Sequence, residues 1–171
     1  MNRGFTLVEM LAVMVILALI LIFAVPAYTA IYTSIRRDNL GGKITEIEAA
    51  ALEYGEKIKD DIKNANNQCI DITVSDLIED GYITSEDDVD AVIYDPTDNS
   101  PLDGEIRICY CNSDYDIDAH YYEEFVRSKV YHEGDVVEYN GSLYQCVIDY
   151  SDGSGINGTT GGKRYFELIT C

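Results

Sequence analysis

Glu9 is a carboxylate at the start of a long apolar run. Residues 10–27 are eighteen consecutive amino acids without a charged side chain, which is about the length of helix that spans the hydrocarbon core of a bilayer. An ionisable group within such a segment is costly and usually has a partner. The residue one helical turn further on is Val13, so the run itself supplies no cation. The pattern therefore predicts that Glu9 pairs with a positive group from elsewhere.

The cysteines indicate a second kind of chemistry, disulfide formation. All five follow the apolar run, at Cys69, Cys109, Cys111, Cys146 and Cys171. This position suits an exported domain in an oxidising compartment. The odd number leaves at least one thiol unpaired. The Cys-Tyr-Cys spacing at 109–111 does not match a zinc or redox pair, and the chain has only two histidines.

The charge balance excludes several functions. The chain has 12 basic and 31 acidic residues, a formal net charge of −19, so direct contact with nucleic acid is not expected. Asp114, Asp116 and Asp118 have the spacing of an EF-hand, but Ala119 and Phe125 occupy positions where that loop needs glycine and glutamate. We therefore expect a solvated acidic loop at 112–118, and no metal or cofactor. No GxSxG, P-loop or HExxH motif occurs, so an enzyme is not predicted.

Three interpretations of the N-terminus are open. A secretory signal has a shorter apolar part and a small-residue cleavage site, and an ordinary membrane anchor leaves Glu9 unexplained. The third interpretation rests on residues 4–10, GFTLVEM, which resemble the processing and assembly motif of type IV pilins and the related pseudopilins.

The resemblance implies how the chain is processed. Residues 1–4 are then a leader that a prepilin peptidase removes between Gly4 and Phe5, and the new N-terminus, Phe5, is methylated. In this family the glutamate at the position of Glu9 pairs with the N-terminal amine of a neighbouring subunit. The implied partners are other pilin subunits, in a homo- or heteropolymer, and the inner-membrane assembly machinery. The implied location is the cytoplasmic membrane, single pass with the head outside, and then the surface pilus.

One long helix is predicted from residue 5 to residue 63. Residues 5–38 form its transmembrane and assembly part, in which Pro26 favours a kink. Gly41 and Gly42 are a second weak point, since glycine costs about 1 kcal/mol relative to alanine in a helix; an ordinary linker is the alternative for both. Beyond them, apolar residues recur at spacings of three and four and predict one buried stripe: Ile44, Ile47, Ala51, Tyr54, Ile58 and Ile62.

A globular head is predicted over residues 39–124, which includes the second half of the long helix. Thr73 and Asp76 resemble a capping box at the start of a short helix that ends at Gly81. Strands are expected at 91–94 and 105–111. The fold class is therefore α+β, a long N-terminal helix packed on an antiparallel sheet, as in pilins.

Residues 125–171 are expected to form a small all-β module. Asn140-Gly141 predicts a type I′ hairpin, and a last strand is expected at 164–169. The region resembles chitin-binding-type carbohydrate-binding modules at the following positions: Phe125, Tyr131, Gly134, Asp135, Val137, Tyr139, Asn140, Gly141, Tyr144 and Phe166. The resemblance implies a polysaccharide ligand that Tyr131, Tyr144 or Tyr165 contacts. Aromatic residues in short strands also build cores, and this alternative stays open.

Cys146 and Cys171 lie together in this module, so we expect them to pair, and Cys69 to pair with Cys109 or Cys111. The overall prediction is a structural subunit of a type IV pilus, a minor or tip pilin with a role in adhesion or motility. One alternative is a pseudopilin of a type II secretion or DNA-uptake system. Another is a membrane-anchored carbohydrate-binding adhesin that does not polymerise.

Overall fold

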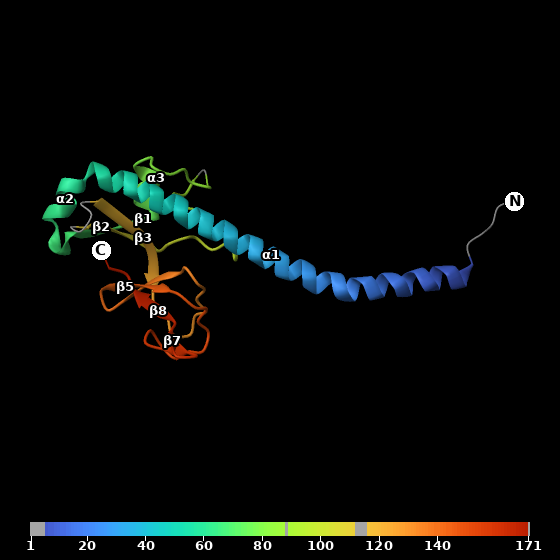
Figure 1. Cartoon of the computed structure of the whole chain (residues 1–171). Helices are drawn as coiled ribbons and strands as arrows, with labels where there is room; N and C mark the ends of the chain where they lie inside the picture. The colour runs from blue at the N-terminus through green and yellow to red at the C-terminus, as the bar shows by residue number, and fades with distance from the viewer. Residues whose placement is uncertain (1–5, 88, 112–115, 171) are drawn as a thin grey trace.

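A single long helix dominates the structure. The computed structural model describes residues 6–87, 89–111 and 116–170, and the side chains of residues 24, 26, 27, 30 and 66 lie outside this description. Helix α1 (Leu7–Lys57) has 51 residues and is therefore about 75 Å long at roughly 1.5 Å per residue. Its N-terminal half projects away from the rest of the molecule, whereas its C-terminal half lies across a β-sheet (Figure 1). The predicted long helix is confirmed, although it ends earlier than residue 63.

The helix ends where the chain must turn back toward the sheet. The N–H of Ile58 donates to the carbonyls of both Tyr54 and Gly55, and a short helix α2 (Lys59–Asn64) follows. This break lets Ile62 become completely buried. A one-turn 3₁₀ helix, η1 (Asn66–Gln68), then reverses the chain.

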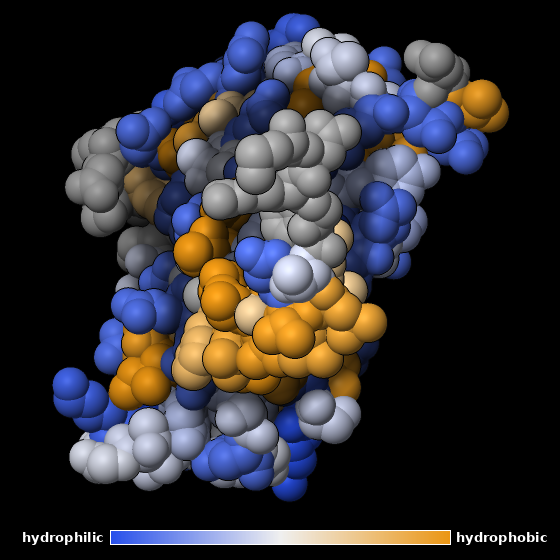
Figure 2. Space-filling model, turned by 90° about the vertical axis from the view of Figure 1, so that its right-hand side faces the viewer, coloured by the Kyte–Doolittle hydropathy of each residue, from blue (hydrophilic) through white to orange (hydrophobic). Residues whose placement is uncertain are grey.

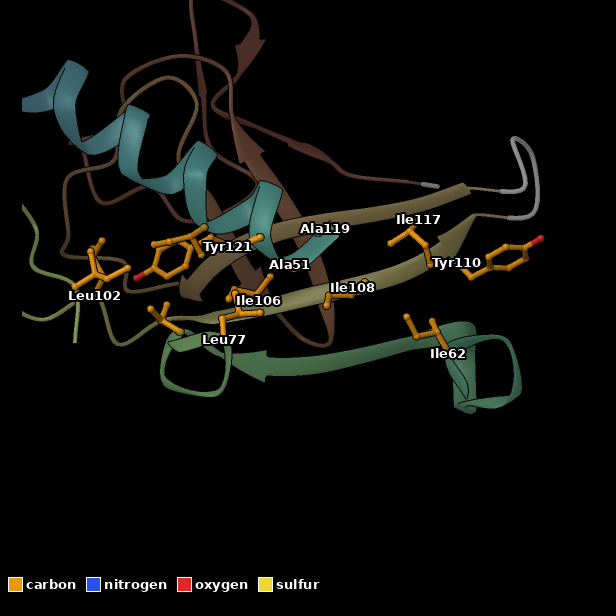
Figure 3. Close-up of a cluster of buried hydrophobic side chains, with 14 residues drawn as sticks. Ala51, Ile62, Leu77, Leu102, Ile106, Ile108, Tyr110, Ile117, Ala119 and Tyr121 are labelled. Carbon is orange, nitrogen blue, oxygen red and sulfur yellow. The ribbon is translucent and has the colours of Figure 1, made fainter. Parts of the chain in front are cut away.

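The second half of α1 buries the predicted apolar stripe. Ile47 and Ala51 have no exposed surface, and they pack with sheet residues in the main core (Figure 3). Helix and sheet are in close contact at Gly55. A Cβ atom there would lie 2.8 Å from Ile108 Cγ2 and 2.9 Å from Ile117 Cγ2, so any larger residue must displace these side chains.

The sheet has six strands in the order β1-β2-β3-β4-β5-β8. All neighbouring strands are antiparallel except β3 and β4, which are parallel. A separate two-stranded hairpin is formed by β6 and β7. The α+β class is confirmed, and the arrangement is consistent with the pilin fold. The strands are β1 (Cys69–Thr73), β2 (Glu105–Cys111), β3 (Asp116–Glu124), β4 (Val136–Tyr139), β5 (Ser142–Cys146), β6 (Thr159–Thr160), β7 (Lys163–Arg164) and β8 (Phe166–Leu168).

Two local predictions are confirmed by backbone geometry. Helix α3 (Val74–Glu79) begins with a reciprocal capping box, in which Thr73 and Asp76 each bond the other's backbone N–H. Between β4 and β5, Asn140 and Gly141 have φ values of 53° and 82°, as a type I′ turn requires.

The strand predicted at 91–94 is wrong. Only Tyr94 makes an isolated bridge, to Pro101. Side chains satisfy the neighbouring amides instead: the N–H of Val92 donates to Ser85 Oγ, and that of Tyr94 donates to a carboxylate oxygen of Glu86. The segment therefore has no need of a ladder partner.

The acidic loop predicted at 112–118 is wrong for its last three residues, because β3 already starts at Asp116; residues 112–115 lie outside the described residues. In this strand Ile117, Ala119 and Tyr121 are buried against α1, whereas Asp116 and Asp118 point the other way. Strand β1 was not expected either. Strand β1 pairs with β2 along its whole length, and β3 pairs with β2 from Asp116 to Tyr122, so the position of both strands depends on β2.

Residues 125–171 have a core of their own but share the sheet of the head. Tyr131, Tyr150 and Phe166 are the largest fully buried side chains of this second core. The parallel pairing of β3 with β4 at Glu123 and Glu124 joins the region to the head. The predicted last strand is shorter than expected, since only Phe166–Leu168 pairs with β5.

Candidate functional site

The N-terminus of α1 is closed by a capping box that contains Glu9. The backbone N–H and the hydroxyl of Thr6 each donate to Glu9 Oε2 at 2.9 Å, and the N–H of Glu9 donates to Thr6 Oγ1 at 3.3 Å. Glu9 thus accepts two hydrogen bonds within its own chain. The box also satisfies amides that the first turn of a helix leaves without a partner.

The N-terminal half of α1 presents an unpacked apolar surface. Every large apolar side chain from Leu7 to Val25 that the structure describes is at least 48% exposed. Figure 2 views the molecule from the N-terminal end of α1, and a hydrophobic surface faces the viewer there. A continuous surface of this kind normally marks contact with protein or membrane. Over the side chains that the structure describes, no helix is both long enough and apolar enough to cross a membrane.

The predicted kink residues lie within a continuous helix. Pro26, Gly41 and Gly42 all belong to α1, and Figure 1 shows that the N-terminal half of this helix is curved. A Cβ atom at Gly41 or Gly42 would contact nothing within 4 Å, so packing does not demand glycine there. A kink at these three residues stays a prediction.

A loop of the head is tied to α1 just beyond the exposed apolar part. Arg36 Nη1 donates to the carbonyl of Thr97 at 2.9 Å. Lys43 Nζ lies 2.7 Å from Glu86 Oε1 and donates to the carbonyl of Tyr94 at 2.6 Å. The Lys43 ammonium lowers the pKa of Glu86 below its ordinary value, and the N–H of Tyr94 acts in the same direction. These bonds fix the loop on the helix.

Glu48 connects α1 to β3. Its Oε1 accepts a hydrogen bond from the N–H of Tyr121 at 3.1 Å and lies 3.9 Å from His120 Nδ1. Burial raises the pKa of Glu48, and the N–H of Tyr121 and the imidazole of His120 only partly oppose this. The apolar stripe does not include Glu48, and the sequence did not reveal its partner, because that partner is 73 residues away.

The cysteine pairing differs from the expectation in the C-terminal region. Cys69 is bonded to Cys109, across β1 and β2, and Cys111 is disulfide-bonded as well. Cys146 is a free thiol without exposed surface. The expected Cys146–Cys171 bridge is therefore wrong; Cys171 itself lies outside the described residues. Cys146 faces the second core, and burial raises the pKa of its thiol to about 11.

The tyrosines proposed to contact a saccharide are mostly core residues. Tyr131 is 2% exposed and Tyr165 is 6% exposed, so neither offers a ring face to a ligand, and their assignment as sugar contacts is corrected. Tyr131 stacks on Phe125, and its hydroxyl accepts a hydrogen bond from the N–H of Val126. Tyr144 is half-buried at the margin of this core.

No group of three or more metal-ligating side chains occurs among the described residues. Asp114, part of the EF-hand-like spacing, lies outside them. Asp116 and Asp118 instead accept hydrogen bonds from the amides of the residues that follow them, Ile117 and Ala119. The carboxylates of β3 thus have a structural role at the backbone.

The N-terminus matches a known family model. Residues 1–25 match the prokaryotic N-terminal methylation motif. No curated protein and no solved structure matches the chain. The match covers Gly4, Phe5, Thr6 and Glu9, the residues on which the resemblance rests, and it supports a pilin-like or pseudopilin-like N-terminus. The head and residues 125–171 lie outside it.

Proposed function

We propose that this chain is a structural subunit of a type IV pilus that assembles through the N-terminal half of α1. The observation that carries the proposal is the coincidence of two features. The methylation motif covers residues 1–25, and the helix that begins within it, at Leu7, exposes the apolar side chains of its N-terminal half without packing them on the head. A helix that is apolar all round is stable only when something else buries it.

Processing exposes the charge that Glu9 needs. Cleavage between Gly4 and Phe5 gives a new amine at Phe5, which is then methylated and remains positive. In a growing fibre this amine, on one subunit, pairs with Glu9 of another. The capping box with Thr6 holds the Glu9 carboxylate until then. A buried carboxylate without a partner costs several kcal/mol, so pairing favours the subunit whose axial register is correct.

The apolar half of α1 has two successive environments in this proposal, first the cytoplasmic membrane and then the fibre core. The eighteen uncharged residues 10–27 support the membrane stage. Burying each large apolar side chain contributes about 1.5–3 kcal/mol, which makes either environment far better than water. The acidic head stays outside, and the prepilin peptidase and the inner-membrane assembly machinery act on the other end.

The β-rich region 125–171, with its own core beside the head, is what favours a minor or tip position and a role in adhesion or motility. A polysaccharide ligand now has less support, since two of its three proposed contacts are buried. Of the three, Tyr144 keeps partial exposure.

The deciding experiment is intact mass and N-terminal sequencing of the protein from its native cells, together with Glu9→Ala. We expect N-methyl-Phe5 as the first residue. Glu9→Ala should be exported and processed but absent from sheared fibres, and Gly4→Val should remain uncleaved. A start at Met1 would contradict the proposal and leave a membrane-anchored head.

The Glu9→Ala variant and a deletion strain together separate the alternatives. A non-polymerising adhesin predicts that Glu9→Ala leaves surface display and sugar binding unchanged. A pseudopilin shares the processing, but its loss should stop secretion of an exoprotein or uptake of DNA rather than surface piliation.

A further inference from the structure

Three residues form one exposed face of α1 at the end of its apolar run. Tyr28 and Tyr32 are stacked, with ring centroids 5.9 Å apart and an interplanar angle of 13°. Arg36 continues this row: its Cζ lies 4.4 Å from the centroid of the Tyr32 ring, and Nη2 donates to the Tyr32 hydroxyl at 2.6 Å. The spacing of four places all three on one side of the helix. We call these residues the 28–36 face.

The rings of this face are open. Tyr28 is 67% exposed and Tyr32 is 43% exposed, so neither ring is part of a core. One turn further on, Leu40 packs against the main core of the head. The 28–36 face therefore lies at the boundary between the apolar half of α1 and the head.

The distance of the 28–36 face from the start of α1 matches the thickness of the hydrocarbon core of a bilayer. From Leu7 to Tyr28 the helix advances 21 residues, or about 32 Å at ~1.5 Å per residue. The hydrocarbon core of a bilayer is about 30 Å thick. With Glu9 at one interface, Tyr28 reaches the other.

The chemistry of the face also suits that boundary. Tyrosine is enriched at membrane–water interfaces, where its ring lies among the chain ends and its hydroxyl reaches water. Arginine extends from an apolar segment toward the headgroup level in the same way. Arg36 and Arg37 are the only basic residues in 5–42 of a chain whose net charge is −19. The phosphate of a lipid headgroup is thus a suitable counter-charge at this level.

We propose that the 28–36 face seats the unassembled subunit at the membrane–water interface, with Tyr28 and Tyr32 among the lipid headgroups and Arg36 beside their phosphates. This inference rests on the membrane stage of the proposed function. It also sets the height of the head, because Arg36 holds the Thr97 loop through its carbonyl.

Tryptophan fluorescence tests the depth directly, because the chain contains no tryptophan. Tyr28→Trp, Tyr32→Trp and Leu17→Trp are made separately in the full chain. Each variant is reconstituted in phosphatidylethanolamine–phosphatidylglycerol vesicles that carry a nitroxide quencher at the headgroup or deep in the acyl chain. Leu17 lies ten residues after Leu7, about 15 Å along the helix and near the bilayer centre.

We expect the headgroup quencher to be the more effective one for Tyr28→Trp and Tyr32→Trp, and the deep quencher to be the more effective one for Leu17→Trp. If the deep quencher dominates in Tyr28→Trp as well as in Leu17→Trp, the boundary lies elsewhere, and the inference fails while the membrane stage survives.

Two further outcomes would also overturn the inference. If neither quencher acts on Tyr28→Trp while Leu17→Trp is still quenched from the deep position, the 28–36 face lies outside the lipid and the inference fails. If Leu17→Trp responds to neither quencher, the membrane stage of the proposed function fails as well.

A second pair of variants tests the arginine. In the Tyr28→Trp background, Arg36→Gln should shift quenching toward the deep label, because the charge that stays at the headgroup level is lost. Arg36→Lys keeps that charge and should preserve the depth. If Arg36→Gln leaves the depth of quenching unchanged, Arg36 has no role in the proposed placement.

Discussion

Arg107 on β2 is joined to Asp71 on β1 by two parallel hydrogen bonds. Nε donates to Oδ1 at 2.7 Å, and Nη2 donates to Oδ2 at 3.0 Å. The same guanidinium donates through Nη1 to the carbonyl of Gly141, in the β4–β5 turn. One side chain therefore links the edge of the head's sheet to the C-terminal region.

Replacing Arg107 should weaken the junction between these two parts. The pair is partly exposed, since 18% of the Arg107 side chain and 40% of the Asp71 side chain are accessible. We therefore expect the free energy of unfolding to fall by about 1–2 kcal/mol. This loss is larger than that for an exposed ion pair and smaller than that for a buried one. Urea unfolding of Arg107→Gln in detergent, compared with Arg107→Lys, measures this. Lysine keeps the charge but cannot form the paired bonds, so equal stability of arginine and lysine proteins would contradict the geometry.

Among the four cysteines that the structure describes, Cys146 should be the one that reacts after unfolding without a reductant. The folded protein buries its thiol, and Cys69, Cys109 and Cys111 are disulfide-bonded. Iodoacetamide should therefore modify none of these four cysteines in the native protein, and only Cys146 among them in the denatured, unreduced protein. Peptide mass mapping locates the label. A label on Cys69 or Cys109 would refute the β1–β2 bridge.

The Cys69–Cys109 bridge closes a segment with a sequence separation of 40. In the chain-entropy model such a crosslink contributes about 4 kcal/mol to the free energy of unfolding. The double variant Cys69→Ser/Cys109→Ser should unfold at a lower urea concentration, as expected for a loss of about 4 kcal/mol. Cys146→Ser is the control, because it changes a cysteine without removing a crosslink. A double variant as stable as the control would show that the bridge contributes little.

Titration of Glu48 should make the free energy of unfolding fall as pH rises. Its pKa is raised in the folded state by burial, so the folded protein holds this proton in a pH range where the unfolded chain has already lost it. The contribution is therefore present at low pH and decreases from about the ordinary value, 4.5, up to the raised pKa. Asp135 has the same direction of shift, so the test is the difference between wild type and Glu48→Gln.

In Glu48→Gln this part of the pH dependence should vanish, since an amide oxygen still accepts the Tyr121 N–H without titrating. Urea unfolding between about pH 4.5 and about pH 7 measures the difference. Glu48→Ala should lose about 1–3 kcal/mol at the acid end of this range, because a buried N–H loses its acceptor. A pH profile of Glu48→Gln identical to that of the wild type would exclude Glu48 as the titrating group.

Thr6 should matter for assembly through its hydroxyl. Thr6→Val keeps the shape but removes the side-chain bonds to Glu9, which costs the cap about 1 kcal/mol. We expect fewer subunits in sheared fibres at an unchanged amount of processed protein, and recovery in Thr6→Ser. Loss of processing in Thr6→Val would assign the residue to the peptidase instead.

Local patterns in the sequence were sufficient for several elements. The apolar stripe predicted the buried face of α1, because its members are neighbours on one helix. The Thr73–Asp76 capping box and the Asn140-Gly141 turn were predicted for the same reason, since the bonds of the box join residues three apart and the turn depends on two adjacent residues. The methylation motif is local as well.

Strands β1 and β3 were missed because their place depends on partners that are remote in sequence. Asp116 and Asp118 resemble loop residues until β2 pairs with the strand and α1 covers its apolar side. Conversely, 91–94 has a strand-like composition, but Ser85 and Glu86 satisfy its amides from outside.

The sequence by itself determined the processing motif, the long helix, the acidic character of the head and the turn chemistry, all of which depend on residues that are close along the chain. Only the tertiary structure decided which cysteines pair and which tyrosines are buried. Those outcomes depend on strand register: Cys109 meets Cys69 because β1 and β2 align there, and Cys146 lies opposite Phe166 on β8, facing a core. Register is set by packing across the whole sheet, and a shift of one residue would reverse every one of these orientations.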